Sequence, residues 1–251
     1  MNWQFLRTRK VMWSAWLCCV CASVMAQQAY QPYQKPTERQ PGIYFPQAPL
    51  PGEWRKSLGL VFTSTPPEIT EEIRVIVPAI DVNLQKRLSK QWYLSGRIQT
   101  QVVQSNLALG PRYATRLTDK LFVGLGIDGV CWFGALTIKD VFNSQALGLQ
   151  TIPNVSLGYR PTRDLQLTFR TEGVMDLYYR SRAGSLEIEY KRRQLNGVAF
   201  VFALEQPFYK QRHVSLGVRA LYSNFNWQFW SLYATFERDF FYPQLFFDFI
   251  L

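Results

Sequence analysis

The sequence predicts an all-β fold, an antiparallel up-and-down transmembrane β-barrel of about 12 strands, with about 10 as the alternative. An N-terminal signal peptide and a disordered leader precede the barrel. Three observations predict this fold. Apolar and polar residues alternate over long segments, the links between segments are too short for crossover helices, and the chain starts with an export signal. The 251 residues are 47% hydrophobic, too apolar for a disordered chain and too polar for a bundle of membrane helices.

Residues 1–26 have the features of a secretory signal peptide. A basic stretch with Arg7, Arg9 and Lys10 precedes an apolar run over residues 11–25, and Ala26 provides the small residue before the expected cleavage. The apolar run is shorter than the ~20 residues that a membrane helix needs. Cleavage leaves Cys131 as the last cysteine beside a single histidine, so we expect no intramolecular disulfide, no metal and no cofactor.

Residues 27–54 form the predicted leader. They hold six prolines and six glutamines and show neither helical nor strand periodicity. We therefore expect a disordered tether between the signal peptide and a barrel over residues 55–251. The formal net charge of +10 comes without a dense run of Lys or Arg, which argues against a nucleic-acid partner and is compatible with anionic lipid headgroups.

Eleven segments alternate well enough to be strands. They are 58–63, 76–86, 92–102, 107–117, 121–133, 151–160, 165–177, 198–205, 214–222, 227–237 and 243–251. A bacterial barrel with both ends on one side needs an even number of strands. Counting residues 186–191 as a strand gives twelve. If those residues instead extend a neighbouring strand and one weak run near a terminus is false, the number is ten.

The length of these segments favours a membrane barrel over a soluble β-sandwich, because strands that cross a bilayer need about ten residues. Arginine on the polar face and lysine in the turns point to an enclosed interior. Aromatic residues near strand ends suggest the two interfacial girdles of such barrels: Trp92 and Tyr93, Trp132 and Phe133, Tyr178 and Tyr179, and Trp227 with Trp230. The exported β-sandwich remains the alternative.

The polar face carries four arginines and five acids that we expect to line the lumen and to pair across it. They are Asp81, Arg97, Arg112, Asp128, Arg170, Glu172, Asp176, Glu205 and Arg219. Because unpaired charge is costly in a narrow interior, such pairing predicts a filled or constricted lumen. A small-solute channel is the alternative, since about twelve strands are too few for a wide pore.

The last residues resemble the C-terminal insertion signal of Gram-negative outer-membrane β-barrel proteins, with Phe247, Phe249 and Leu251 alternating along the final segment. The resemblance covers the architecture of residues 55–251. It implies a place in the cell outer membrane, contact with the lipid bilayer and lipopolysaccharide, and insertion by the barrel-assembly machinery. It also allows an extracellular or periplasmic protein partner. The expected role is structural, transport-related or partner-binding.

An enzymatic alternative rests on the only histidine. His213 and Ser215 share one face of a segment, and Glu205 on a neighbouring segment could orient the imidazole, so a lipid or acyl hydrolase is conceivable. The His-x-Ser pair is similar to that of the lipid A deacylase family of outer-membrane barrels, but Leu216 stands where that family has asparagine. The other interpretation places His213 in a polar turn. We expect no enzymatic activity.

Overall fold

The computed structural model describes residues 42–68, 75–138, 142–162, 164–183, 186–188, 194–209, 212–230 and 238–251. The predicted signal peptide and residues 27–41 of the predicted leader lie outside the described residues. The chain divides into two units, Met1–Arg39 and Gln40–Leu251, and the second unit contains all the strands.

The described part of the chain forms eleven strands and one short 3-10 helix, and no helix in it is long and apolar enough to span a membrane. The elements are β1 (Trp54–Ser64), β2 (Ile76–Arg87), β3 (Trp92–Thr100), β4 (Gln104–Arg116), β5 (Leu121–Ile138), β6 (Phe142–Tyr159), β7 (Gln166–Ala183), β8 (Leu186–Ile188), β9 (Leu195–Tyr209), β10 (Arg212–Ser223), η1 (Trp227–Phe229) and β11 (Phe240–Ile250).

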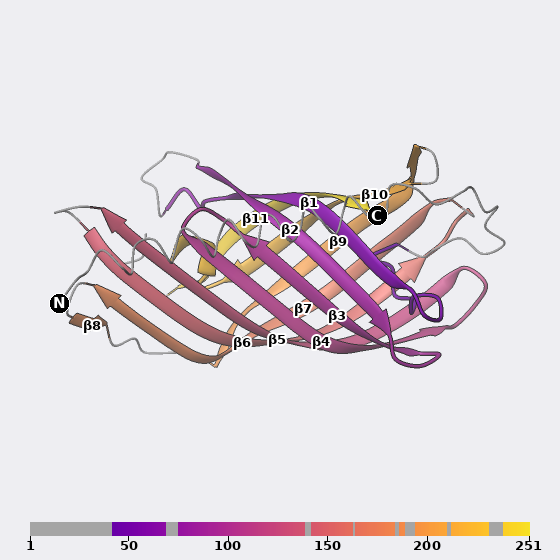
Figure 1. Ribbon diagram of the computed structural model, residues 1–251, viewed down its shortest axis with the longest axis horizontal. Helices are drawn as coiled ribbons and strands as arrows, with labels where there is room; N and C mark the ends of the chain where they lie inside the picture. Colours follow the sequence, from indigo (N-terminus) through magenta and orange to yellow (C-terminus); the bar gives the residue numbers. More distant parts are fainter. Residues whose placement is uncertain are drawn as a thin grey trace. The chain divides into compact units, whose positions relative to one another are not determined.

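Ten of the described strands close into a ring in which every neighbouring pair is antiparallel (Figure 1). The order β6-β5-β4-β3-β2-β1-β11-β10-β9-β7 returns to β6, and β1 pairs with β11 from Ser57↔Ile250 to Thr63↔Gln244. The ring excludes the two-sheet sandwich. The predicted all-β, antiparallel up-and-down barrel is confirmed with ten strands, so the alternative count is right and the count of twelve is wrong.

The two additional strands of the twelve-strand prediction are absent from the ring for different reasons. β8 pairs only with Ser181–Ala183 of β7 and adds a short extension beside the ring. The predicted strand over 227–237 begins instead as η1, whose first turn is capped by the Asn226 side chain accepting from the Gln228 amide, and residues 231–237 lie outside the described residues. Trp227, Gln228 and Phe229 are all buried, whereas a strand would turn alternate residues outward.

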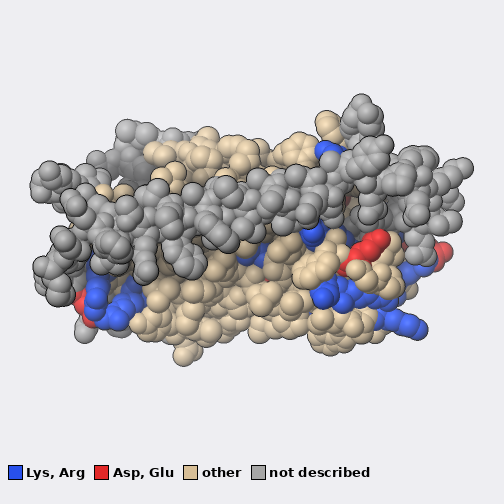
Figure 2. Space-filling model, in the orientation of Figure 1, with Lys and Arg blue, Asp and Glu red and all other residues tan. Residues whose placement is uncertain are grey.

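The alternation sorts the ring strands into two faces. The inward face holds nearly all the buried polar residues, and the outward face is apolar. The exposed apolar side chains include Leu60, Phe62, Ile80, Leu107, Leu109, Leu125, Ile127, Leu147, Val155, Leu157, Phe169, Leu177, Phe200, Phe202, Leu216, Val218, Phe241, Leu245 and Phe249. Between its two ends, the outer face visible in Figure 2 carries few charged side chains.

The predicted aromatic girdles need correction. Trp92, Phe133 and Tyr178 are exposed on the outward face, but Trp132, Trp227 and Trp230 are buried in the interior, as is Tyr93. Two adjacent strand residues point to opposite faces, so a pair such as Trp132 and Phe133 cannot both face outward. Trp132 instead packs against Tyr179 and Phe225, with ring centroids 5.7 Å and 5.2 Å apart.

The described part of the predicted leader also differs from the expectation. Strand β1 already begins at Trp54, and residues 42–46 are buried rather than free in solvent. We call residues 42–50 the N-terminal plug, because they lie inside the ring among inward-facing side chains. Six prolines prevent regular structure in the leader, but they do not prevent a short irregular segment from binding inside the ring.

Candidate functional site

Two segments of the chain occupy the barrel interior. The N-terminal plug lies at the end where β1 begins and β11 ends, which we call the terminal end. Residues 225–230, which follow β10, fold inward at the opposite end and are called the inner loop. All six residues of the inner loop are buried. The candidate site is the space between these two segments.

Inward side chains of the ring hold the backbone of the N-terminal plug. Glu205 accepts hydrogen bonds from the amides of Tyr44 (3.0 Å) and Phe45 (2.9 Å), and Gln166 accepts one from the Gly42 amide (2.8 Å). Arg55 donates to the Gly42 carbonyl at 2.6 Å, and Gln85 donates to the Ile43 carbonyl at 2.7 Å. These side chains satisfy backbone groups of the plug that would otherwise be buried without a hydrogen-bond partner.

The side chains of the plug are also anchored. Tyr44 donates from its phenol to Asp248 at 2.9 Å, and its ring lies 4.6 Å from that of Phe246. Burial, followed by the charge of Asp248, raises the pKa of Tyr44 well above its usual value, so the phenol stays protonated and able to donate. Phe45 packs edge-on against Phe122, with 4.9 Å between ring centroids.

Glycines on the ring wall make room for this segment. A Cβ atom at Gly124 would lie 2.8 Å from Pro46, and one at Gly158 would lie 2.7 Å from Pro46 and 2.8 Å from Phe45. Such distances require something to shift. The wall and the plug are therefore matched in shape, which is a specific fit rather than an incidental contact.

The inner loop is fixed mainly by apolar packing. Phe225, Trp227 and Trp230 form a buried cluster with Trp132 and Ala146. Gly134 faces the Trp230 ring closely enough that a Cβ atom there would overlap it. Polar contacts set its position as well, because Thr63 donates to the Gln228 side chain at 2.7 Å. The inner loop thus bounds the interior from the end opposite to the N-terminal plug.

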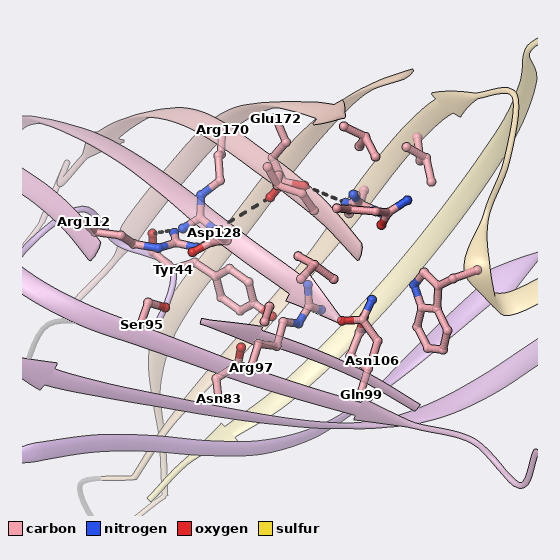
Figure 3. A pocket seen from close by; sticks show the side chains of 18 of the residues that line it. Tyr44, Asn83, Ser95, Arg97, Gln99, Asn106, Arg112, Asp128, Arg170 and Glu172 are labelled. Atoms are coloured by element: carbon pink, nitrogen blue, oxygen red, sulfur yellow. Dashed lines mark hydrogen bonds and ion pairs between the residues drawn. The ribbon is translucent and has the colours of Figure 1, made fainter. Parts of the chain in front are cut away.

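A cavity of about 80 Å³ lies between the two segments (Figure 3). We call it the chamber. One water molecule needs roughly 10–15 Å³ of cavity volume by this measure, so the chamber has room for about five to eight water molecules. Ile43 and Tyr44 of the plug bound it at one side and Phe225, Asn226 and Trp227 of the inner loop at another. Its charged lining consists of Arg97, Arg112, Arg170, Arg219, Asp128 and Glu172.

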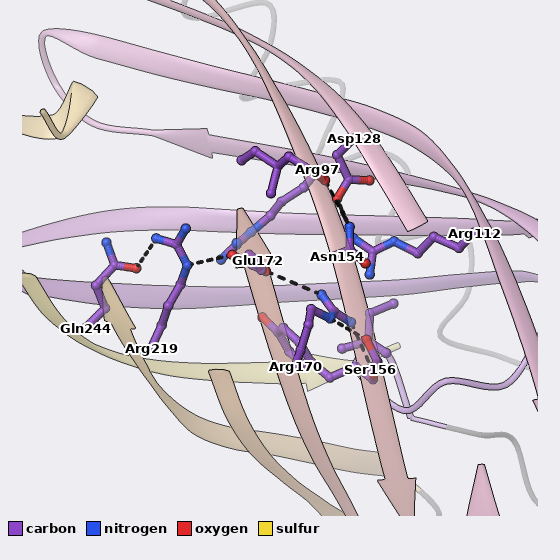
Figure 4. Close-up of polar contacts among 12 residues, drawn as sticks. Arg97, Arg112, Asp128, Asn154, Ser156, Arg170, Glu172, Arg219 and Gln244 are labelled. Atoms are coloured by element: carbon purple, nitrogen blue, oxygen red, sulfur yellow. Dashed lines mark hydrogen bonds and ion pairs between the residues drawn. The ribbon is translucent and has the colours of Figure 1, made fainter. Parts of the chain in front are cut away.

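Three of the four arginines have a carboxylate within hydrogen-bond distance, and Figure 4 shows two of these contacts, Arg112 with Asp128 and Arg219 with Glu172. Arg97 binds Asp81, which is fully buried behind it, through two nitrogens at 2.8 Å and 2.9 Å. Arg112 donates to Asp128 at 2.7 Å.

Arg219 donates to Glu172 at 2.9 Å. The first two pairs join neighbouring strands of the ring, whereas Arg219 on β10 and Glu172 on β7 lie on either side of β9. Each contact holds its guanidinium group in place.

Arg170 differs from the other three. Its hydrogen bonds go to uncharged groups, the Ser156 hydroxyl at 2.9 Å and the Tyr44 carbonyl at 3.2 Å. Its ion-pair contact is to Glu172 at 3.9 Å, and that carboxylate already accepts from Arg219. Arg170 is therefore the one of the four lining arginines that has no carboxylate at hydrogen-bond distance.

All nine charged residues expected in the lumen point inward, but they do not form one network. Asp176 lies nearer the inner loop and accepts from Gln150 at 2.6 Å and from Asn196 at 3.2 Å. Glu205 lies at the terminal end and holds the N-terminal plug. Only the other seven surround or support the chamber.

For the enzymatic alternative, the structure shows a direct contact between Ser215 and Glu205. Ser215 donates to Glu205 at 2.6 Å and has no exposed surface. The same carboxylate accepts from the amides of Tyr44 and Phe45. Glu205 thus holds the plug and Ser215, which leaves the hydroxyl directed at a carboxylate rather than at an incoming acyl group.

Sequence reasoning missed Tyr44, which anchors the plug to Asp248, and it missed Arg55, Gln85 and Gln166, which hold the plug backbone. The available signal was the short apolar cluster Ile43-Tyr44-Phe45 within an otherwise polar leader. Among the described residues, no group of three or more His, Cys, Asp or Glu side chains could hold a metal ion. The predicted insertion signal, Phe247, Phe249 and Leu251, lies on the outward face of β11 and its end, and its role stays a prediction.

No protein-family model matches the sequence, and no curated protein is significantly similar to it. Among solved structures, the chain is similar to the KdgM porin, with 8% identity over 76% of this chain and 97% of that one and a TM-score of 0.37. It is similar to the translocator domain of the autotransporter NalP from Neisseria meningitidis (7% identity, 78% and 87% coverage, TM-score 0.43). It is also similar to the COG4313 outer membrane channel from Pseudomonas putida F1 (6%, 87% and 100%, 0.39).

Proposed function

We propose that this protein is a gated outer-membrane channel for small anionic solutes, held closed by the N-terminal plug and the inner loop. One observation carries the proposal: a polar chamber with an excess of arginine lies between two segments that belong to the chain itself. A purely structural barrel could fill its interior with apolar side chains. Here the middle of the interior keeps space and charge, which burial makes costly unless they serve a purpose.

The outward face supports the membrane location. Large apolar side chains are exposed on all ten ring strands, and the strands have 9 to 18 residues, enough to cross a bilayer when tilted. A soluble protein rarely exposes so large a continuous apolar surface. The export signal predicted for residues 1–26 supports the same location.

A charged side chain on the outward face should therefore destabilise the protein only near the middle of the bilayer. We expect Val218→Arg, at the centre of β10, to lower the free energy of unfolding by about 2–4 kcal/mol, because the guanidinium would face hydrocarbon. Leu88→Arg, in the turn between β2 and β3, should change it by about 0–1 kcal/mol. Urea unfolding in phospholipid vesicles measures both. Equal effects of the two substitutions would contradict the membrane location.

Conductance across a planar bilayer tests the channel. The full-length protein should conduct little, because the plug and the inner loop occupy the interior. A variant lacking residues 42–50 should conduct more, and a variant that also lacks residues 225–230 should conduct most. In a KCl gradient, the reversal potential should show a preference for chloride, because four arginines face the chamber against two acids.

A control variant also carries a deletion but spares the plug and the inner loop. Deleting part of the connection between β1 and β2, at residues 66–68, should leave conductance at the wild-type level. If the double deletion variant folds, as judged by migration on a gel before and after boiling, and does not conduct, the channel is ruled out. A preference for potassium would contradict the anionic solute.

A further inference from the structure

We infer that the chamber is a binding site for a small monocarboxylate, received by Arg170 and Arg112. The inference rests on the proposed function, because a solute reaches this space only when the plug or the inner loop moves. It goes further in naming the chemistry of the solute and the residues that hold it. Neither the conductance nor the selectivity expected above requires a binding site of this kind.

The unmatched guanidinium is the first argument. Arg170 is buried, has two uncharged hydrogen-bond partners, and shares a distant carboxylate with Arg219. A buried cation without its own counter-charge is strongly unfavourable, whereas a charge-assisted hydrogen bond to a carboxylate is among the strongest polar contacts. The chamber beside Arg170 has the space for a group that would supply the missing negative charge.

The second argument is an unused donor on Arg112. This side chain is buried and lines the chamber, and its Nη2 donates to Asp128. Its Nε has no hydrogen-bond partner among the described residues. A buried donor without an acceptor costs about 1–3 kcal/mol, so Arg112 keeps hydrogen-bonding capacity that the described side chains do not use. Figure 3 shows Arg112 and Arg170 on the same side of the chamber.

Charge and size restrict the ligand. Among the four arginines that line the chamber, Arg170 is the one without a carboxylate at hydrogen-bond distance, so a single negative charge is enough to match it, and a monocarboxylate provides one. The space of about five to eight water molecules limits the solute to a similar number of non-hydrogen atoms. Asn83, Gln99 and Asn106 also line the chamber and can bind a hydroxyl group on the same solute.

Calorimetric titration with lactate tests the inference, because lactate has six non-hydrogen atoms (about the size limit above) and carries one carboxylate and one hydroxyl. Lactamide has the same size without the charge. The titrations use the full-length protein in vesicles and, in parallel, the Glu205→Ala variant, in which the plug is released. Lactate should bind saturably to at least the second protein, and lactamide should not.

Substitutions then locate the site. Arg170→Gln should weaken lactate binding about tenfold or more, the loss expected for one charge-assisted hydrogen bond, while Arg170→Lys should keep most of the affinity. Arg180→Gln is the matched control, because Arg180 is exposed and pairs with Glu187 outside the interior. Unchanged binding in Arg170→Gln would overturn the inference.

Two further outcomes would overturn it: equal binding of lactamide, and no binding of lactate to either protein. The result is separable from that of the conductance experiment. Conductance without lactate binding removes the site and leaves the channel, whereas lactate binding without conductance in any variant keeps the site and removes the channel.

Discussion

Replacing Glu205 by alanine will release the N-terminal plug while leaving the barrel folded. The carboxylate accepts from the amides of Tyr44 and Phe45 and from the Ser215 hydroxyl, so its loss removes two of the contacts that hold the plug backbone. Hydrogen bonds to a charged group contribute about 1.5–3 kcal/mol each. Losing two should raise the population of the released plug by about 100-fold or more. The ring strands keep all their backbone pairs.

Limited digestion with chymotrypsin measures the release. The bond after Tyr44 is buried in the wild type and should be cleaved slowly, whereas Glu205→Ala should be cleaved there quickly, giving a fragment that starts at Phe45. Conductance should rise in the same variant. Glu205→Gln keeps one acceptor oxygen but turns an NH2 group toward the other amide, so its cleavage rate should be intermediate.

Gln206→Ala is the matched control, because Gln206 is the next residue of β9 and is exposed on the outward face. It should be cleaved as slowly as the wild type. Slow cleavage after Tyr44 in a folded Glu205→Ala variant would show that Glu205 does not hold the plug. It would also remove the main support for a gate at the terminal end.

The ring itself could be predicted from the sequence because alternation is a local property. A residue on a strand points inward or outward according to its position along that strand, and burial of one face fixes the register. Asp81, Arg97, Arg112 and Asp128 were therefore assigned to the interior from their neighbours in the sequence alone, and the structure buries them or turns them inward.

The pairing of those residues could not be predicted in the same way. Alternation gives the face of a residue but not its height in the barrel, which depends on the shear between strands. Arg219 and Glu172 are 47 positions apart and meet at 2.9 Å, whereas Glu205 lies beside the plug and away from the chamber arginines. The nine charged residues for this reason form several separate sets of contacts rather than one network.

The two segments inside the barrel were missed because their structure depends on distant contacts. The inner loop carries closely spaced aromatic residues, Phe225, Trp227, Phe229 and Trp230, and this pattern imitates a strand with aromatic ends. What decides its fold is the cluster with Trp132 on β5. Likewise, Tyr44 binds Asp248 across 204 positions of sequence, which no local pattern reports.

The second large effect concerns the buried pair at the chamber wall. We expect Asp81→Leu to lower the free energy of unfolding by about 3 kcal/mol, because it leaves the Arg97 guanidinium without its carboxylate in a mostly buried position. Asp81 has no exposed surface, and Arg97 binds both of its oxygens. Asn83 also donates to Asp81 at 3.2 Å and would lose that acceptor.

The double variant Asp81→Leu with Arg97→Leu tests whether the lost stability comes from the unpaired charge of Arg97. Removing both charges should restore most of the lost stability, since replacing a buried ion pair by apolar groups is often close to neutral. Glu187→Ala, which breaks the exposed pair with Arg180, should leave the unfolding midpoint unchanged, because exposed pairs contribute little. Urea unfolding in vesicles measures all the variants.

Asp81→Leu should also strengthen the preference for chloride in any conducting variant, because the chamber wall then carries a second unmatched arginine. A stable Asp81→Leu variant with unaltered selectivity would mean that Arg97 is neutralised by another group and that the charge of the chamber is not set by these pairs.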